Sequence, residues 1–149
     1  MTCSLYNLYH FTGDSMILRN EQILNVFSAL NTLGNEKFSA KFAWKITTAR
    51  GVLTTFVETL EKSINELRLK YAMRDEKGDI VVSKNEAGEP VEGTMVLSPD
   101  TVPLYYNEMT ELMNVEITVE NVTLSIDDFP ATFEVSPNML TALEPILQT

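Results

Sequence analysis

One run of apolar residues at helical spacing constrains this chain more than any other feature. Between Ser39 and Tyr71, apolar side chains recur every three or four residues, which is the pattern of one face of an α-helix. Ser39 is a suitable N-cap. The sequence therefore predicts one long helix over residues 39–71. Its stripe consists of Phe42, Ile46, Ala49, Leu53, Phe56, Leu60, Ile64, Leu67 and Tyr71.

This helix is long for a chain of 149 residues. At 1.5 Å per residue it would extend about 50 Å, whereas a globule of this chain length has a diameter of roughly 40 Å. Apolar surface would then be exposed unless a second copy or another protein covers it, although Gly51 could kink the helix or admit a close neighbour. We therefore expect a homo-oligomer, with burial inside the monomer as the competing interpretation. The candidate interface residues are Leu53, Phe56, Leu60, Ile64 and Leu67.

Three shorter helices are expected around the long one. Residues 20–33 have helical periodicity, with Asn20 as a plausible N-cap and Gly34 as a stop. Ser98-Pro99 begins a helix through residue 112, and Ser136-Pro137 begins a last short helix.

The remaining segments favour strands. Residues 79–84 and 91–97 predict a short hairpin, and residues 115–119 and 122–126 alternate in hydrophobicity. A bulge or tight bend at Glu120 and Asn121 explains the phase slip between the latter two. Phe133 and Val135 favour one further strand. The predicted fold is α+β, with a long helical hairpin in the N-terminal part and a small antiparallel sheet with two short helices in the C-terminal part.

One domain is expected over residues 16–149, which is an ordinary size for a single core. Residues 1–15 lack a regular period and are predicted to be an irregular extension. The change of pattern at Met16 favours Met16 over Met1 as the natural start.

The residue inventory leaves little room for catalysis. His10 is the only histidine and Cys3 the only cysteine, so a histidine triad, a two-histidine metal site and an intrachain disulfide cannot be built from one chain. The six glycines do not cluster as a phosphate-binding loop requires. Neighbouring carboxylates, such as Asp127 and Asp128, could bind a cation, but solvated surface is the favoured interpretation. We expect no enzyme activity, no cofactor and no metal. No apolar run is long enough to cross a membrane.

Charge is segregated along the chain. Residues 1–84 hold nine acids and eleven bases, a net charge of +2, whereas residues 85–149 hold twelve acids and no Lys or Arg. The second stretch would repel DNA and RNA, so direct nucleic-acid binding is not expected. An acidic face could attract a basic surface, either that of a nucleic-acid-binding protein or the basic half of a second copy of this chain; the alternative is that these carboxylates only keep the surface soluble. The candidate partner-binding residues are Glu108, Glu111, Glu116, Glu120, Asp127 and Asp128.

Several segments resemble an uncharacterised family of small proteins from phages and prophages of Gram-positive bacteria. The resemblance rests on Ile17 to Gln22, Leu69-Lys70-Tyr71, the Asp75 to Gly78 turn, Glu108 to Leu112, and Ser136-Pro137 to Leu143-Glu144-Pro145. It covers roughly residues 16–147, and residues 1–15 depart from the family's usual start. The resemblance implies a viral origin and supplies no catalytic or binding residues.

These observations favour a phage accessory protein that binds and inhibits a host protein, such as a defence factor, through its acidic surface in the cytoplasm of the infected bacterium. The expected partner is a host or phage protein with a basic surface. The alternative is a virion structural protein or assembly chaperone, which would place it in the virion. An enzyme or small-ligand binder ranks third.

Overall fold

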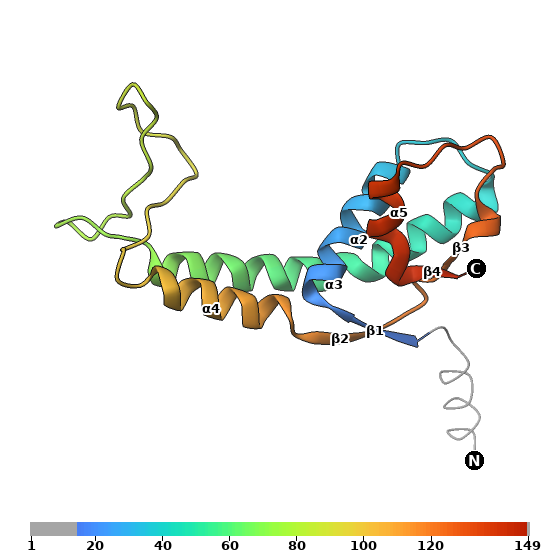
Figure 1. Cartoon of the computed structure of the whole chain (residues 1–149), viewed down its shortest axis with the longest axis horizontal. Coiled ribbons are helices and arrows are strands. Elements are labelled where there is room, and N and C mark those ends of the chain that lie inside the picture. The colour runs from blue at the N-terminus through green and yellow to red at the C-terminus, as the bar shows by residue number, and fades with distance from the viewer. Residues whose placement is uncertain (1–14, 149) are drawn as a thin grey trace, which may run out of the picture. The chain divides into compact units, whose positions relative to one another are not determined.

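The structure is a computed structural model that describes residues 15–148, and it has the mixed α and β content that the sequence predicts (Figure 1). Two compact units divide the chain: unit 1 comprises residues 1–59 and 114–149, and unit 2 comprises residues 60–113. The domain predicted over residues 16–149 thus contains two units, and the predicted extension, Ser15 excepted, lies outside the described residues. The elements in chain order are β1 (Ser15–Arg19), α2 (Asn20–Leu33), α3 (Ala40–Tyr71), α4 (Val102–Met113), β2 (Glu116–Glu120), β3 (Leu124–Ser125), η1 (Ile126–Asp128), α5 (Pro137–Leu143), η2 (Glu144–Ile146) and β4 (Leu147–Gln148).

Most helix boundaries follow local signals in the sequence, although Arg19, and not the predicted Asn20, is the N-cap of α2. Helix α2 ends at the predicted stop, where the Gly34 N–H donates to the Leu30 carbonyl at 2.9 Å. Helix α3 starts at its predicted cap, where the Ser39 hydroxyl accepts a hydrogen bond from the Phe42 N–H at 3.3 Å. It continues through Gly51 without a break. The long helix of the sequence analysis is therefore confirmed.

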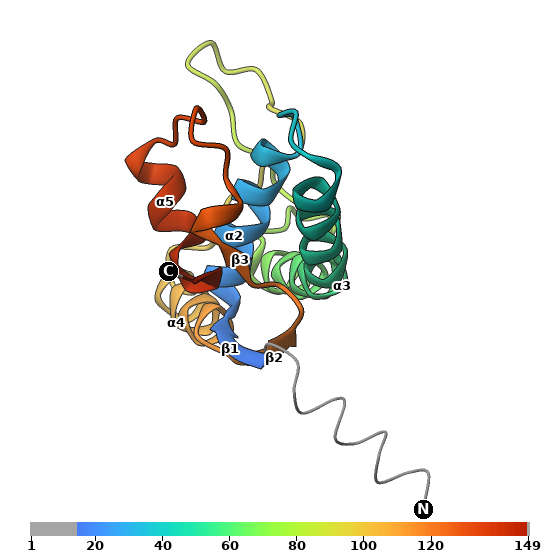
Figure 2. The ribbon, with the colours of Figure 1, turned by 90° about the vertical axis from the view of Figure 1, so that its right-hand side faces the viewer.

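Unit 1 contains the hydrophobic core. Helix α5 packs against α2 (Figure 2), and both contribute side chains to one cluster with the N-terminal part of α3 and the segment after β2. The largest of its fully buried side chains are Leu18, Ile23, Leu30, Leu33, Phe42, Leu53, Leu124, Leu143 and Ile146.

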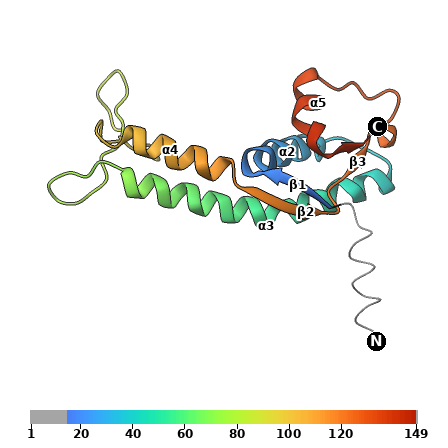
Figure 3. The ribbon, with the colours of Figure 1, turned by 60° about the horizontal axis from the view of Figure 1, so that its bottom comes forward.

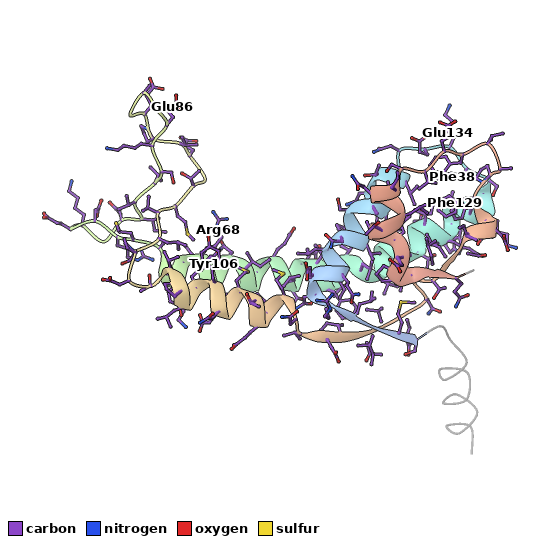
Figure 4. All side chains as sticks on the ribbon, in the orientation of Figure 1. Phe38, Arg68, Glu86, Tyr106, Phe129 and Glu134 are labelled. Carbon is purple, nitrogen blue, oxygen red and sulfur yellow. The ribbon has the colours of Figure 1, made fainter. Side chains whose placement is uncertain are left out.

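Four phenylalanines extend this core at one end of α3. The ring centroid of Phe42 lies 4.8 Å from those of both Phe38 and Phe129, and Phe38 lies 5.2 Å from Phe133 (Figure 4). The strand predicted at Phe133 and Val135 is wrong, because the chain turns there instead: the Phe133 N–H donates to the Pro130 carbonyl at 2.9 Å. Aromatic packing, rather than strand pairing, explains why Phe133 is apolar.

Two small sheets belong to unit 1. Strands β1 and β2 are antiparallel, with Arg19 opposite Glu116, whereas β3 and β4 are parallel. The predicted antiparallel sheet is thus found only in part. Asn121 has a left-handed φ of 61°, which confirms the tight bend expected between the two alternating segments.

Unit 2 is built from two helical segments and a long connection. Residues 60–71 of α3 lie beside α4 (Figures 1 and 3). Between them the chain turns at Gly78 (φ 85°), Gly88 (φ 81°) and Gly93 (φ 78°). The predicted hairpin forms around the Gly88 turn, where the Val91 N–H donates to the Ser83 carbonyl at 2.9 Å. The Val96 N–H also donates to the Val81 carbonyl, at 3.0 Å. Glu86 lies near the tip of the second turn (Figure 4).

The long N-terminal helical hairpin is not confirmed. Helix α2 has 14 residues against 32 in α3, so it can cover less than half of the longer helix. The C-terminal part of α3 has α4 as its neighbour instead. Helix α4 also begins at Val102 rather than at Pro99, because residues 99–101 form a turn in which the Thr101 N–H donates to the Ser98 carbonyl at 3.0 Å.

Candidate functional site

The six acidic residues predicted to bind a partner are divided between the two units. Glu108 and Glu111 are on α4 of unit 2, whereas Glu116 and Glu120 are on β2 of unit 1. Asp127 and Asp128 lie in η1, also in unit 1. The structure therefore does not assemble the six residues within one unit.

Two of these acids are paired with bases from the first half of the chain. The Lys70 ammonium lies 2.9 Å from the Glu108 carboxylate, and hydrogen bonds from Lys70 and Tyr71 lower the pKa of Glu108. The Lys45 ammonium lies 2.7 Å from the Asp128 carboxylate and lowers the pKa of Asp128. Both carboxylates are therefore ionised, but the paired lysine offsets part of the negative charge that each would present to an external partner. Of the six, Glu111, Glu116, Glu120 and Asp127 are exposed.

The fold redistributes the charge that is segregated along the sequence. By count, unit 1 has ten acids and five bases, and unit 2 has eleven acids and six bases, so each carries a net charge of −5. The base-free stretch of residues 85–149 contributes to both units. It does not by itself define one anionic surface.

The candidate interface residues on α3 fall into two groups. Leu53 and Leu60 are buried in the single chain, at 0% and 3% exposure, so they need no second chain to cover them. Phe56 is half-buried against the core of unit 1. Ile64 and Leu67, in unit 2, are half-buried and keep part of their apolar surface accessible. The competing interpretation, burial inside the monomer, thus describes the first part of the stripe.

Unit 2 has an open helical seam. None of residues 61–113 is buried, although α3 and α4 carry several half-buried apolar side chains in this range. The Tyr71 and Tyr105 rings meet edge to face at 6.1 Å, and the Lys70–Glu108 pair joins the same two helices. Two helices can bury only the line along which they touch. We call the half-buried residues Ile64, Leu67, Tyr71, Tyr105, Met109 and Leu112 the unit 2 seam.

A groove in unit 1 was not anticipated from the sequence. It has a volume of about 260 Å³ and lies beside Trp44, the only tryptophan, which is 72% exposed on α3. One signal was available: Trp44 falls outside the apolar stripe of the long helix, so a solvent-facing indole could have been predicted from helical spacing. The groove is lined by Trp44, Lys45, Thr48, Asn121, Thr123, Ser125 and Gln148.

Among residues 15–148, no group of three or more His, Cys, Asp or Glu side chains is arranged to hold a metal ion. No helix in the same range is long and apolar enough to traverse a lipid bilayer. Comparison with protein-family models finds no match, and comparisons with curated protein sequences and with solved structures find none either.

Proposed function

We propose that this protein acts by docking to another protein chain rather than by catalysis, and that the unit 2 seam is its docking surface. The observation that carries the proposal is the absence of any buried side chain across residues 61–113, in a unit whose two helices carry half-buried apolar residues and meet through the Tyr71 and Tyr105 rings. A unit of this size needs more buried apolar surface to be stable alone. A partner that covers the seam would supply it.

The partner that the charges of unit 2 fit is a second copy of the same chain. Residues 60–71 of α3 carry three bases and two acids, whereas α4 carries two acids and no base. A two-fold arrangement that sets α4 of one copy against α3 of the other brings opposite charges together. It would also enclose the seam between four helices, which is the usual way for helix pairs to bury an apolar stripe.

Light scattering on the full chain across protein concentration tests this proposal. We expect the mass to rise from the 16.8 kDa of one chain to about twice that value. Leu67→Gln and Met109→Gln should each weaken the dimer about tenfold, since each places a polar group in the covered seam. Leu140→Gln, at an exposed leucine of unit 1, is the matched control and should leave the mass unchanged. Circular dichroism of each variant separates lost association from lost folding. A single-chain mass at every concentration would refute self-docking.

An assembly role is the function this geometry supports best. Under the phage origin that the family resemblance implies, such a protein would act in virion assembly or as a virion component. Detection of the chain in purified virions by mass spectrometry tests that role.

A second candidate is docking to a basic host protein through the exposed acids. It is favoured by the exposure of Glu116 and Glu120 on one strand and of Asp127 in the same unit. Charge reversal of these three residues to Lys should slow association with a basic host protein and flatten its dependence on salt. Unchanged association in the triple variant would exclude the acidic surface as the binding site.

A further inference from the structure

The groove beside Trp44 has a chemical character that sets it apart from the rest of unit 1. Its opposite walls come from two regions of the chain: Trp44, Lys45 and Thr48 from α3, and residues 121–125 with Gln148 from around the β3–β4 pair. Apart from Trp44 and Lys45, every lining side chain is a neutral amide or hydroxyl.

The polar wall follows from the alternation of the strand residues. Val122 and Leu124 are buried in the core, so Thr123 and Ser125, between and after them, face the other way. Ser125 is opposite Gln148 in the parallel β3–β4 pair. Asn121, at the left-handed bend, completes the row. Asn121, Ser125 and Gln148 therefore bring amide and hydroxyl groups to the groove, which both donate and accept hydrogen bonds. The Ser125 hydroxyl already accepts a hydrogen bond from the Asp127 N–H at 3.3 Å and remains able to donate one.

The other wall contains the indole ring of Trp44, which is exposed to solvent. A tryptophan that is 72% exposed gains little from burial. Exposed aromatic rings beside polar groups are characteristic of binding surfaces. Trp44 offers an apolar face next to the hydrogen-bonding row of the opposite wall.

Among the described residues, the groove offers no unpaired charge to an ionic ligand. Lys45 is the one charged side chain that these residues contribute to the lining, and its ammonium is held by Asp128 at 2.7 Å. Recognition of a phosphate or carboxylate depends on unpaired bases. A neutral ligand therefore fits this lining better than an anionic one.

One polar atom in the wall lacks a partner. The Thr123 hydroxyl oxygen is covered from solvent and has no hydrogen-bond partner among the described residues. Buried polar groups are nearly always hydrogen-bonded, so such an exception calls for a reason. Because Thr123 lines the groove, a hydroxyl group of a bound ligand could supply the missing partner if the side chain adopts another staggered position.

We propose that this groove binds a neutral carbohydrate, with the apolar face of a sugar ring stacked on Trp44 and the sugar hydroxyls hydrogen-bonded to Asn121, Thr123, Ser125 and Gln148. Aromatic stacking combined with amide and hydroxyl groups matches the two surfaces of a sugar, whose ring carbons are apolar on one face and whose edge is polar. The volume of about 260 Å³ lies just below the roughly 300 to 1,000 Å³ of pockets that hold drug-sized ligands. It suits one or two sugar units of a longer glycan. The site lies within unit 1 and does not depend on docking through unit 2.

The single tryptophan makes the test direct, because all indole fluorescence of the chain comes from the groove. The full chain is titrated with maltotriose, cellotriose and triacetylchitotriose up to about 10 mM, the range that covers weak binding. We expect a saturable blue shift with at least one of them, as a sugar ring excludes water from the indole. Trp44→Ala, measured by calorimetry, should lower the affinity about tenfold or more.

Two adjacent threonines provide matched variants. Thr48→Ala removes a groove hydroxyl and should weaken binding about threefold to tenfold, whereas Thr47→Ala, at an exposed position of the same helix that does not line the groove, should leave it unchanged. The proposal is overturned if none of the three sugars shifts the fluorescence, or if both threonine variants behave alike. A response to adenosine monophosphate or to a short neutral peptide in place of the sugars would also overturn it.

Discussion

At the scale of single residues, the core of unit 1 depends on a few large side chains. Phe42 is 2% exposed, and its ring centroid lies 4.8 Å from those of Phe38 and Phe129. We expect Phe42→Ala to lower the free energy of unfolding by about 3 to 5 kcal/mol, because the lost apolar contacts leave a cavity. Denaturant unfolding measures this change. Phe42→Leu fills most of the space and should cost clearly less, and equal costs for the two variants would contradict the packing argument.

The Lys45–Asp128 pair gives unit 1 a dependence on pH. Because the ion pair lowers the pKa of Asp128 below its ordinary value of 3.8, the pair stabilises the folded state above that pH. The stabilisation is lost as the pH falls through the folded-state pKa. Since both side chains are partly exposed, we expect Asp128→Asn to cost only about 0.5 to 1 kcal/mol at pH 7, and this cost should shrink as the pH falls below 3.8. Urea unfolding at pH 7 and at acidic pH measures the difference.

Asp127→Asn is the control for that experiment, because Asp127 is exposed and adjacent. A cost of the same size at Asp127 would show that general charge, and not the pair with Lys45, stabilises this turn.

At the scale of elements, α3 contains a glycine that its geometry does not require. A Cβ at Gly51 would meet nothing within 4 Å, and the residue is in the middle of a continuous helix. Gly51→Ala should raise the free energy of unfolding by about 0.5 to 1 kcal/mol, because alanine loses less backbone entropy in a helix. Thermal or urea unfolding measures the gain.

Gly88→Ala is the contrasting variant, since Gly88 has a left-handed φ of 81° that strains any side chain. It should destabilise the turn. If Gly51→Ala instead weakens self-association at unchanged helicity, Gly51 serves as a contact point for a neighbouring chain.

Local signals predicted where most helices begin and end. The Ser39 and Ser136 caps and the Gly34 stop act through hydrogen bonds within a few residues, so their effect is visible in sequence. The hairpin expected around residues 85–90 is found, whereas the strand expected at Phe133 was wrong. A short apolar run such as that at Phe133 fits more than one structure, and its contact with the distant Phe38 ring decided between them.

At the scale of the whole chain, the two units should differ in local stability. Unit 1 has a buried core, whereas residues 61–113 have no buried side chain. We expect backbone amides of the 72–101 connection to exchange with solvent fastest, and those of α4 to become more protected as protein concentration rises and a second copy covers the seam. Hydrogen exchange at two concentrations measures this. Protection of α4 that is independent of concentration would contradict self-docking.

The candidate sites were only partly visible before the fold was known. Ile64 and Leu67 came from the apolar stripe, and the structure leaves them partly accessible in unit 2. The Trp44 groove was missed, because residues 44–48 on one wall and residues 121–148 on the other are more than seventy positions apart in the sequence. No local pattern relates such distant segments.

The sequence by itself determined the helices, the acidic composition and the scarcity of catalytic residue types, because these depend on residue identity and on spacing of a few positions. Only the tertiary structure decided which charges are paired and which apolar faces are covered. No Lys or Arg lies among the acids of residues 85–149 in the sequence, yet Glu108 and Asp128 each form an ion pair with a lysine from the first half of the chain. Long-range packing sets such contacts, so the same stripe of α3 is mostly buried as far as Leu60 and only half-buried from Ile64 onward.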